Sequence, residues 1–337
     1  MNKETLNCEL ITPMFSSGMD TRKAELRASE LKALMRYVYR ISNQTLDTQQ
    51  LYEEEARLFG DAEKHASPIR LQLVAGNLKW KSEPLLLHRE KYETKYPNRS
   101  IPYRGCFLAK ETYSIVLRKF LNKGEELSFY RNLVLLSLIL GGMGKRSRRG
   151  RGCSSIISAD GSVPNLTRES LLPWMTEQLN LLNATTDHSA SSVYTMEKGI
   201  IRVDSKRVET RDSQKRPVIE EIRLGKTIKD IYQFLLQVDL ASHEIKDKYK
   251  PKIRDNYKPP TNNLFATGYA YTGSKFASSL LISVTRTSEG ELLPVYTFVK
   301  AFVDCTKNKN QKPDIQLLDT DYEERNKMIS LIEGGTF

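Results

Sequence analysis

The chain has 337 residues, of which 39% are hydrophobic and 28% are charged, so it can bury the cores of two domains and is not a disordered polypeptide. Its formal net charge of +11 favours an acidic polymer or an acidic surface as the partner. The four cysteines lie far apart without a close pair or a histidine at ligand spacing, which indicates neither a disulfide framework nor a zinc site.

The first half of the chain predicts two strand–helix–strand units. Apolar residues of its first helix recur at 3.6-residue spacing, as expected of a face that packs on a sheet; they are Leu31, Leu34, Met35, Val38 and Ile41. In chain order the expected elements are a strand over Leu6–Pro13, a helix from near Ser29, strands over Ile69–Ala75 and Thr112–Phe120, a deeply buried helix over Leu127–Leu140 and a strand over Cys153–Ser158.

This order is the split βαβ arrangement of a ferredoxin-like domain, which RNA recognition modules also use. Long insertions are expected over 47–66 and 77–104. The small, polar stretch after Asn183 predicts a linker. The second half repeats the pattern with a strand over Val218–Leu224, a helix over Thr227–Leu240, a hairpin of Ser279–Thr287 and Leu292–Val303, and a helix over Tyr322–Ile332. We therefore predict an α+β chain with two ferredoxin-like domains, residues 1–182 and 199–337, joined by a linker over 183–198.

Residues 141–152, with the sequence GGMGKRSRRGRG, set four glycines around clustered cations in a G-x-G-x5-G-x-G array. Glycine permits positive φ and close approach to the backbone, whereas lysine and arginine bind phosphate oxygens. The array predicts a loop that binds a polyanion, with a solvated basic loop as the alternative. It is not a Walker loop, because Ile139 stands where this motif needs a glycine, and Arg146 stands where it needs serine or threonine. The predicted contacts are Gly142, Gly144, Lys145, Arg146, Arg148, Arg149, Gly150, Arg151 and Gly152.

Two further basic segments are candidates for the same partner. Lys32, Arg36 and Arg40 stand at i, i+4 and i+8 on the first helix, where they form either a phosphate-binding ridge or an ordinary solvated face. Cations alternate with tyrosines in a later segment, which indicates either single-strand binding or an extended connector. Its secondary candidates are Lys248, Tyr249, Lys250, Arg254 and Tyr257.

These features resemble the RAMP superfamily of CRISPR proteins, whose members carry such a glycine-rich loop after the second helix of a ferredoxin-like fold. The resemblance rests on Gly142, Gly144, Gly150 and Gly152, on CELITPMFSSGMDTRKAELRASELKALMRYVYR and on LFGDAEKHASPIRLQL. Arg151 departs from the family pattern, which usually has a hydrophobic residue there. Within the superfamily, the length, the two halves and the loop are most similar to the first RAMP subunit of the type III-B (Cmr) effector complex.

The resemblance implies a non-catalytic RNA-binding subunit. The widely spaced cysteines favour a reducing cytoplasm, and we expect no cofactor, metal or membrane partner. The subunit would hold the 3′ region of a guide RNA and its paired target RNA, beside other RAMP subunits and the large polymerase-like subunit. The alternative is a standalone metal-independent endoribonuclease that processes guide precursors with a histidine near the loop. None of His65, His88, His188 and His243 lies in or beside the loop, and Asp20 and Asp61 are typical of turns rather than of catalysis.

Overall fold

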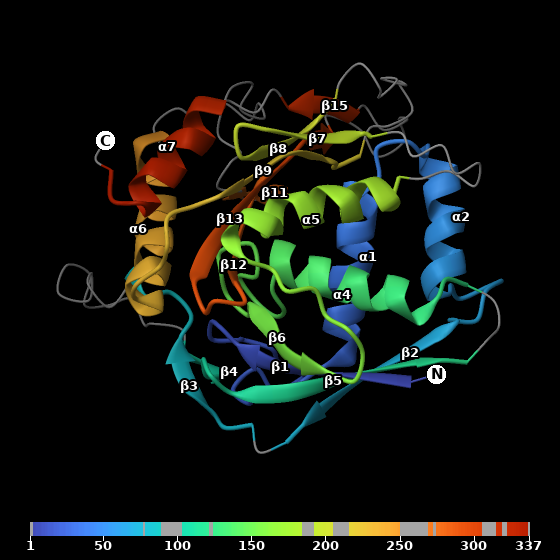
Figure 1. The fold of residues 1–337 in the computed structure, drawn as a ribbon. Coiled ribbons are helices and arrows are strands. Elements are labelled where there is room, and N and C mark those ends of the chain that lie inside the picture. Colours follow the sequence, from blue (N-terminus) through green and yellow to red (C-terminus); the bar gives the residue numbers. More distant parts are fainter. Residues whose placement is uncertain are drawn as a thin grey trace.

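A computed structural model describes residues 3–76, 78–88, 103–120, 124–183, 192–204, 216–249, 269–271, 274–304, 315–318 and 322–335. Two large sheets are separated by a layer of helices, and a further helix pair covers the outer face of the second sheet (Figure 1). The helix layer is therefore enclosed by sheet on two sides. In the described residues no helix has the length and apolar character needed to cross a membrane.

The first sheet is antiparallel and has the strand order of a ferredoxin-like fold. Its strands, in spatial order, are β2 (Ile69–Ala75), β5 (Thr112–Lys119), β1 (Lys3–Leu10) and β6 (Ser154–Ala159). Helix α1 (Ala28–Ser42) follows β1, and α4 (Leu127–Leu140) follows β5. The predicted fold class and the predicted elements of the first half are confirmed.

From Leu133 to Leu140, helix α4 is apolar on nearly all sides because it lies between the two sheets. Residues Leu133–Leu140 are all buried, and the helix contacts β5 and β6 on one side and β12 (Leu280–Arg286) and β13 (Leu292–Val299) on the other. An ordinary surface helix keeps a polar face towards water. Burial between sheets from both halves of the chain therefore explains the continuous apolar run of the sequence.

The second sheet has helices on both faces, so its central strands alternate between two cores. Leu281 and Val295 face the core shared with α4, whereas Ile282 and Phe298 face α6 (Ile231–Tyr249) and α7 (Tyr322–Ile332). The strand order is β12, β13, β9 (Ile219–Leu224), β8 (Ile200–Val203) and β7 (Tyr194–Glu197).

The second sheet differs from the first in the strand that pairs with β9. The matching strand of the first sheet, β1, pairs there with β6, the last strand of its domain. No predicted strand follows α7, and the place beside β9 is taken by β8, which precedes β9 in the chain. Strand β7 pairs with β8 although it falls within the expected linker over 183–198. Part of that linker is thus an edge strand of the second sheet.

The expected insertions contain regular structure that periodicity did not identify. The segment 47–66 holds α2 (Thr48–Phe59), and the hairpin of β3 (Trp80–Pro84) and β4 (Tyr103–Phe107) closes the second insertion. Helix α5 (Arg168–Leu181) follows the first sheet and contacts α4, β7 and β8. Two small hairpins complete the described elements: β10 (Tyr269–Tyr271) with β11 (Ser274–Phe276), and β14 (Ala301–Asp304) with β15 (Ile315–Leu318).

Candidate nucleic-acid interface

The glycines at the two ends of the 141–152 loop close its neck by direct backbone contact. The amide of Met143 donates to the carbonyl of Gly152 at 3.0 Å. A Cβ on Gly152, which has a φ of +69°, would lie 1.9 Å from the carbonyl oxygen of Met143, and a Cβ on Gly142 would lie 2.2 Å from that of Arg151. No side chain fits at such distances. Close packing of the neck therefore accounts for this glycine pair.

The inner part of the loop rests on the segment that follows β1. The amide of Lys145 donates to the carbonyl of Phe15 at 2.9 Å, and a Cβ on Gly144 would lie 2.7 Å from that same carbonyl oxygen. The amide of Gly152 donates to the carbonyl of Pro13 at 2.9 Å. These bonds hold the loop at one end of the first sheet, as its place between α4 and β6 predicts.

The outer part of the loop pairs with the second sheet. Gly150 donates its amide to the carbonyl of Ile282 at 2.8 Å, and Ile282 donates to the carbonyl of Arg148 at 3.2 Å, which gives a short parallel bridge beside β12. The loop is thus hydrogen-bonded to both halves of the chain. Its backbone conformation depends on how the two halves dock.

Four of the loop's five cations donate hydrogen bonds inside the protein. Asp239 of α6, which is fully buried, accepts from Arg146 at 2.6 Å and from Arg151 at 2.9 Å. Arg149 is buried and donates to the carbonyl of Leu280 at 3.1 Å. Burial lowers the pKa of Arg151, and the carboxylate of Asp239 acts in the opposite direction. Asp239 therefore explains how a cation is accommodated at the buried position 151.

Two of the loop's cations, Lys145 and Arg148, border a groove of about 430 Å³. Lys145 is exposed. Arg148 Nη1 donates to the carbonyl of Ser278 at 2.8 Å, and its guanidinium lies 4.9 Å from the centre of the Tyr37 ring, within range of a cation–π interaction. No hydrogen bond in the described part of the chain uses the backbone amides of Gly144, Ser147 or Arg148. Those amides and the two cations form one face that can receive phosphate oxygens.

One face of α1 forms the opposite wall of this groove. Its residues recur at i, i+3, i+4 and i+7 and are Glu30, Ala33, Leu34 and Tyr37. The sequence pattern does not assign these residues to the site, because Leu34 belongs to the apolar stripe of the helix and the others stand apart from the basic ridge. Their shared helical face, ending next to a glycine-rich loop, is the signal that could have identified them.

The predicted basic ridge on α1 lies away from the groove and is paired within the protein. Arg36 Nε donates to Glu55 of α2 at 2.6 Å, and Arg40 Nε lies 3.4 Å from the same carboxylate. Lys32 donates to the hydroxyl of Ser67 at 3.3 Å. Helix α2 thus covers much of the ridge, and its carboxylate balances charge that was expected to face a polyanion.

The secondary candidates fall at the edge of the described residues. Lys248 and Tyr249 end α6, which runs nine residues beyond the predicted helix end at Leu240, and their side chains are outside the described part of the chain. Lys250, Arg254 and Tyr257 lie outside the described residues altogether.

The described histidines do not line the groove. His88 stacks on His243 with ring centroids 5.1 Å apart, and His65 Nδ1 lies 3.1 Å from Asp61 Oδ2. Asp61 Oδ1 accepts three amides of its own turn, and Asp20 accepts the amide of Arg22, so both aspartates form local turns. His188 lies outside the described residues. Within the described ranges, no group of three or more metal-ligating side chains is close enough to hold an ion.

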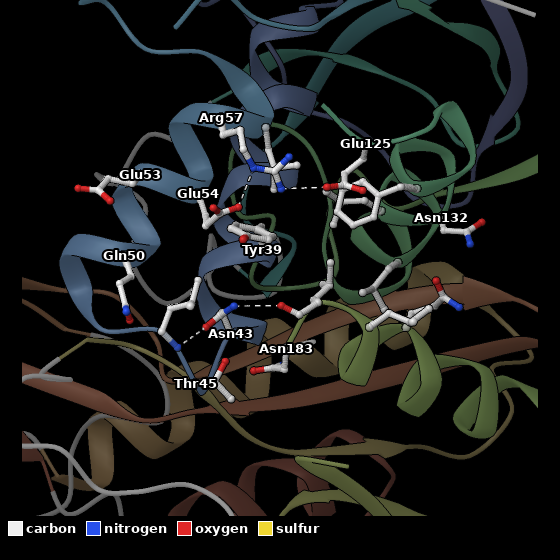
Figure 2. A pocket seen from close by; sticks show the side chains of 18 of the residues that line it. Tyr39, Asn43, Thr45, Gln50, Glu53, Glu54, Arg57, Glu125, Asn132 and Asn183 are labelled. Atoms are coloured by element: carbon white, nitrogen blue, oxygen red, sulfur yellow. Dashed lines mark hydrogen bonds and ion pairs between the residues drawn. The ribbon is translucent and has the colours of Figure 1, made fainter. Parts of the chain in front are cut away.

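A larger cavity of about 730 Å³ lies among the ends of α1, α2, α4 and α5 (Figure 2). Arg57 bridges Glu54 and Glu125 at its rim, and Asn43 bonds to the Leu182 carbonyl beneath. Glu53 adds a further carboxylate. Because its charged side chains are mostly carboxylates, this cavity does not suit a phosphate chain.

The comparisons with known proteins agree with this arrangement. Residues 7–154 match the family model of the RAMP superfamily. The fold is similar to the crystal structure of Cmr1 from Pyrococcus furiosus in its apo form, with a TM-score of 0.56 and 17% identity, covering 98% of this chain and 96% of that one. It is also similar to a chain of the type III-B Cmr-beta complex bound to cognate target RNA, with a TM-score of 0.56 and 12% identity over 98% and 99% of the two chains. No curated protein matches the chain. The chain as a whole thus has the fold seen in Cmr1, and its residues 7–154 resemble the RAMP superfamily.

Proposed function

We propose that the chain is a non-catalytic RNA-binding subunit of a type III-B CRISPR effector complex. It would hold the 3′ region of the guide RNA and its paired target RNA, next to other RAMP subunits and the large polymerase-like subunit. Similarity to Cmr1 over nearly the whole length of both chains supports this assignment. So does the similar chain from a Cmr-beta complex whose structure contains cognate target RNA.

The observation that carries the proposal is the open face of the glycine-rich loop. Its glycines and buried arginines fix the backbone against both halves of the chain, and this leaves Lys145, Arg148 and unused amides around one groove. A loop held on both sides loses little conformational freedom when it binds, which favours affinity. The buried arginines serve as supports rather than as RNA ligands.

The mechanism that follows is binding without base selection by the loop. The lysine, the arginine and the amides contact phosphates, which carry no sequence information. Sequence recognition would then come from base pairing between guide and target, as in other RNA-guided complexes. Lys32, Arg36 and Arg40 remain in the proposal as a weaker, partly neutralised extension of the positive surface.

Purification of the tagged full-length chain from cells that carry its CRISPR locus tests the proposal. We expect other Cmr subunits and guide RNAs to copurify, and we expect a Lys145→Ala/Arg148→Ala variant of unchanged melting temperature to recover less RNA. Recovery of the wild-type chain alone, or with RNAs unrelated to guides, would contradict the assignment.

A processing nuclease remains the alternative function, and its one supporting observation is the Asp61–His65 pair. This pair borders a cavity of about 470 Å³ that Lys32 also lines, so an acid–base residue and a cation share one surface. Incubating the full-length chain with labelled guide precursor in EDTA tests this function. Discrete products that disappear in a His65→Ala variant would replace the binding assignment by a catalytic one.

A further inference from the structure

One carboxylate lines the groove beside the glycine-rich loop. Glu30 lies in the first turn of α1, and its Oε2 atom is buried without a hydrogen-bond partner in the described part of the chain. A buried acceptor that lacks a donor is costly, so such atoms are rare in folded proteins. Burial raises the pKa of Glu30, while Ser16 and Lys145 act in the opposite direction.

A carboxylate in a phosphate-binding groove repels the ligand unless it accepts a hydrogen bond from it. A negative residue in the first turn is favoured by the helix dipole, which explains its presence in α1. The dipole does not explain why a carboxylate lines a groove that Lys145 and Arg148 also border. The expected ligand therefore carries a hydrogen-bond donor close to its phosphate.

Two groups of a single-stranded nucleic acid can donate at this place, the base edges and the ribose 2′-hydroxyl. Base donors differ from one nucleotide to the next, whereas the 2′-hydroxyl stands beside the 3′-phosphate of every ribonucleotide and is absent from DNA. A site that holds RNA of any sequence matches the second donor. The apolar wall formed by Leu34, Tyr37 and Leu281 leaves room for a sugar next to the cations.

We infer that Glu30 accepts a hydrogen bond from the ribose 2′-hydroxyl of the nucleotide whose phosphate is bound by Lys145 and Arg148, and so makes the groove selective for RNA over DNA. This inference rests on the proposed function, since it requires RNA in the groove. It adds a residue that recognises the sugar to a loop that recognises phosphate.

The test compares three labelled oligouridine 12-mers that differ only at the 2′ position: hydroxyl, fluoro and hydrogen. A 2′-fluoro sugar keeps the ribose-like pucker but cannot donate, so it isolates the hydrogen bond from sugar conformation. For the wild-type full-length chain we expect the RNA to bind roughly tenfold more tightly than the 2′-fluoro strand, as for a hydrogen bond to a charged group.

Variants assign this preference to Glu30. Glu30→Ala should bind the three strands with similar affinity, whereas Glu30→Gln, which keeps an acceptor oxygen, should retain part of the preference. Glu25→Ala removes a nearby exposed carboxylate that does not line the groove and should behave as wild type. Equal binding of RNA and 2′-fluoro strand by the wild-type chain, or an unchanged preference in Glu30→Ala, overturns the inference.

The outcomes also separate this inference from the proposed function. If the wild-type chain binds both strands equally, and Lys145→Ala still weakens both, the phosphate site stands and the sugar contact is wrong. If no strand binds, the proposed RNA-binding function fails together with the inference. The comparison of strands on the wild-type chain needs no variant, so a variant that fails to fold does not prevent the test.

Discussion

Replacing Lys145 with alanine should flatten the salt dependence of RNA binding, because Lys145 is one of only two loop cations that border the groove. At a single-strand slope of about −0.7 per neutralised phosphate, two contacts predict a roughly sevenfold loss of affinity between about 50 and 200 mM salt. One contact predicts only a roughly threefold loss. If Arg146, Arg149 and Arg151 bound phosphates as well, five contacts would give a loss of roughly a hundredfold.

Fluorescence anisotropy with a labelled oligouridine 12-mer measures these slopes on the full-length chain. Lys229→Ala is a matched control, since it removes an exposed cation that does not line the groove. We expect the control to keep the wild-type slope and Lys145→Ala to lower its magnitude by about 0.7. An unchanged slope in Lys145→Ala, or a hundredfold loss in the wild-type chain, would refute the division of the loop into supporting and RNA-binding cations.

Three further predictions concern the supports of the loop and one turn. Asp239→Ala leaves the buried guanidinium of Arg151 uncompensated and should lower the free energy of unfolding by about 3–5 kcal/mol in urea titrations; a change below about 1 kcal/mol would contradict the buried pair. Gly152→Ala should lower the melting temperature far more than Gly290→Ala. Both glycines have positive φ, but nothing lies within 4 Å of a Cβ at Gly290. Equal melting temperatures of the two variants would show that the neck of the loop is not tight. Hydrogen bonds from the amides that follow it lower the pKa of Asp61, so its contribution is fully present above the unfolded value of about 3.9 and declines as pH falls from there through the lower folded-state pKa. The difference in melting temperature between wild type and Asp61→Asn should therefore be smaller at pH 2 than at pH 6, and an equal difference at the two pH values would contradict it.

The sequence predicted the order of the main elements because each has a clear local pattern. The apolar stripe of α1 and the strand-forming run of β5 depend on neighbours a few residues apart, and the structure confirms both elements. Helix α4 was expected to be buried, but its cause, a second sheet on its far side, depends on docking that no local pattern encodes. The missed helix α2 begins with an Asp47–Gln50 capping box, a local signal that was overlooked.

The sequence predicted the position of the candidate site but not the roles of its individual residues. The glycine array located the loop, yet its glycines are explained largely by backbone contacts of the neck. The loop arginines were expected to face a polyanion, but their counter-charge is Asp239, 88 residues beyond Arg151 in the chain. Such a partner cannot be recognised from a charge run alone. The groove-lining face of α1 was not predicted from the sequence, because it shares Leu34 with the apolar stripe that packs on the core.

Photocrosslinking is the most direct test of the central claim that the open face of the glycine-rich loop contacts RNA. The purified chain, alone and within its assembled complex, would be irradiated with 4-thiouridine-substituted RNA, and the crosslinked residues mapped by mass spectrometry. We predict crosslinks at Tyr37, Lys145 and Arg148, which border the groove. Crosslinks confined to other surfaces, with these three residues unmodified, would contradict it.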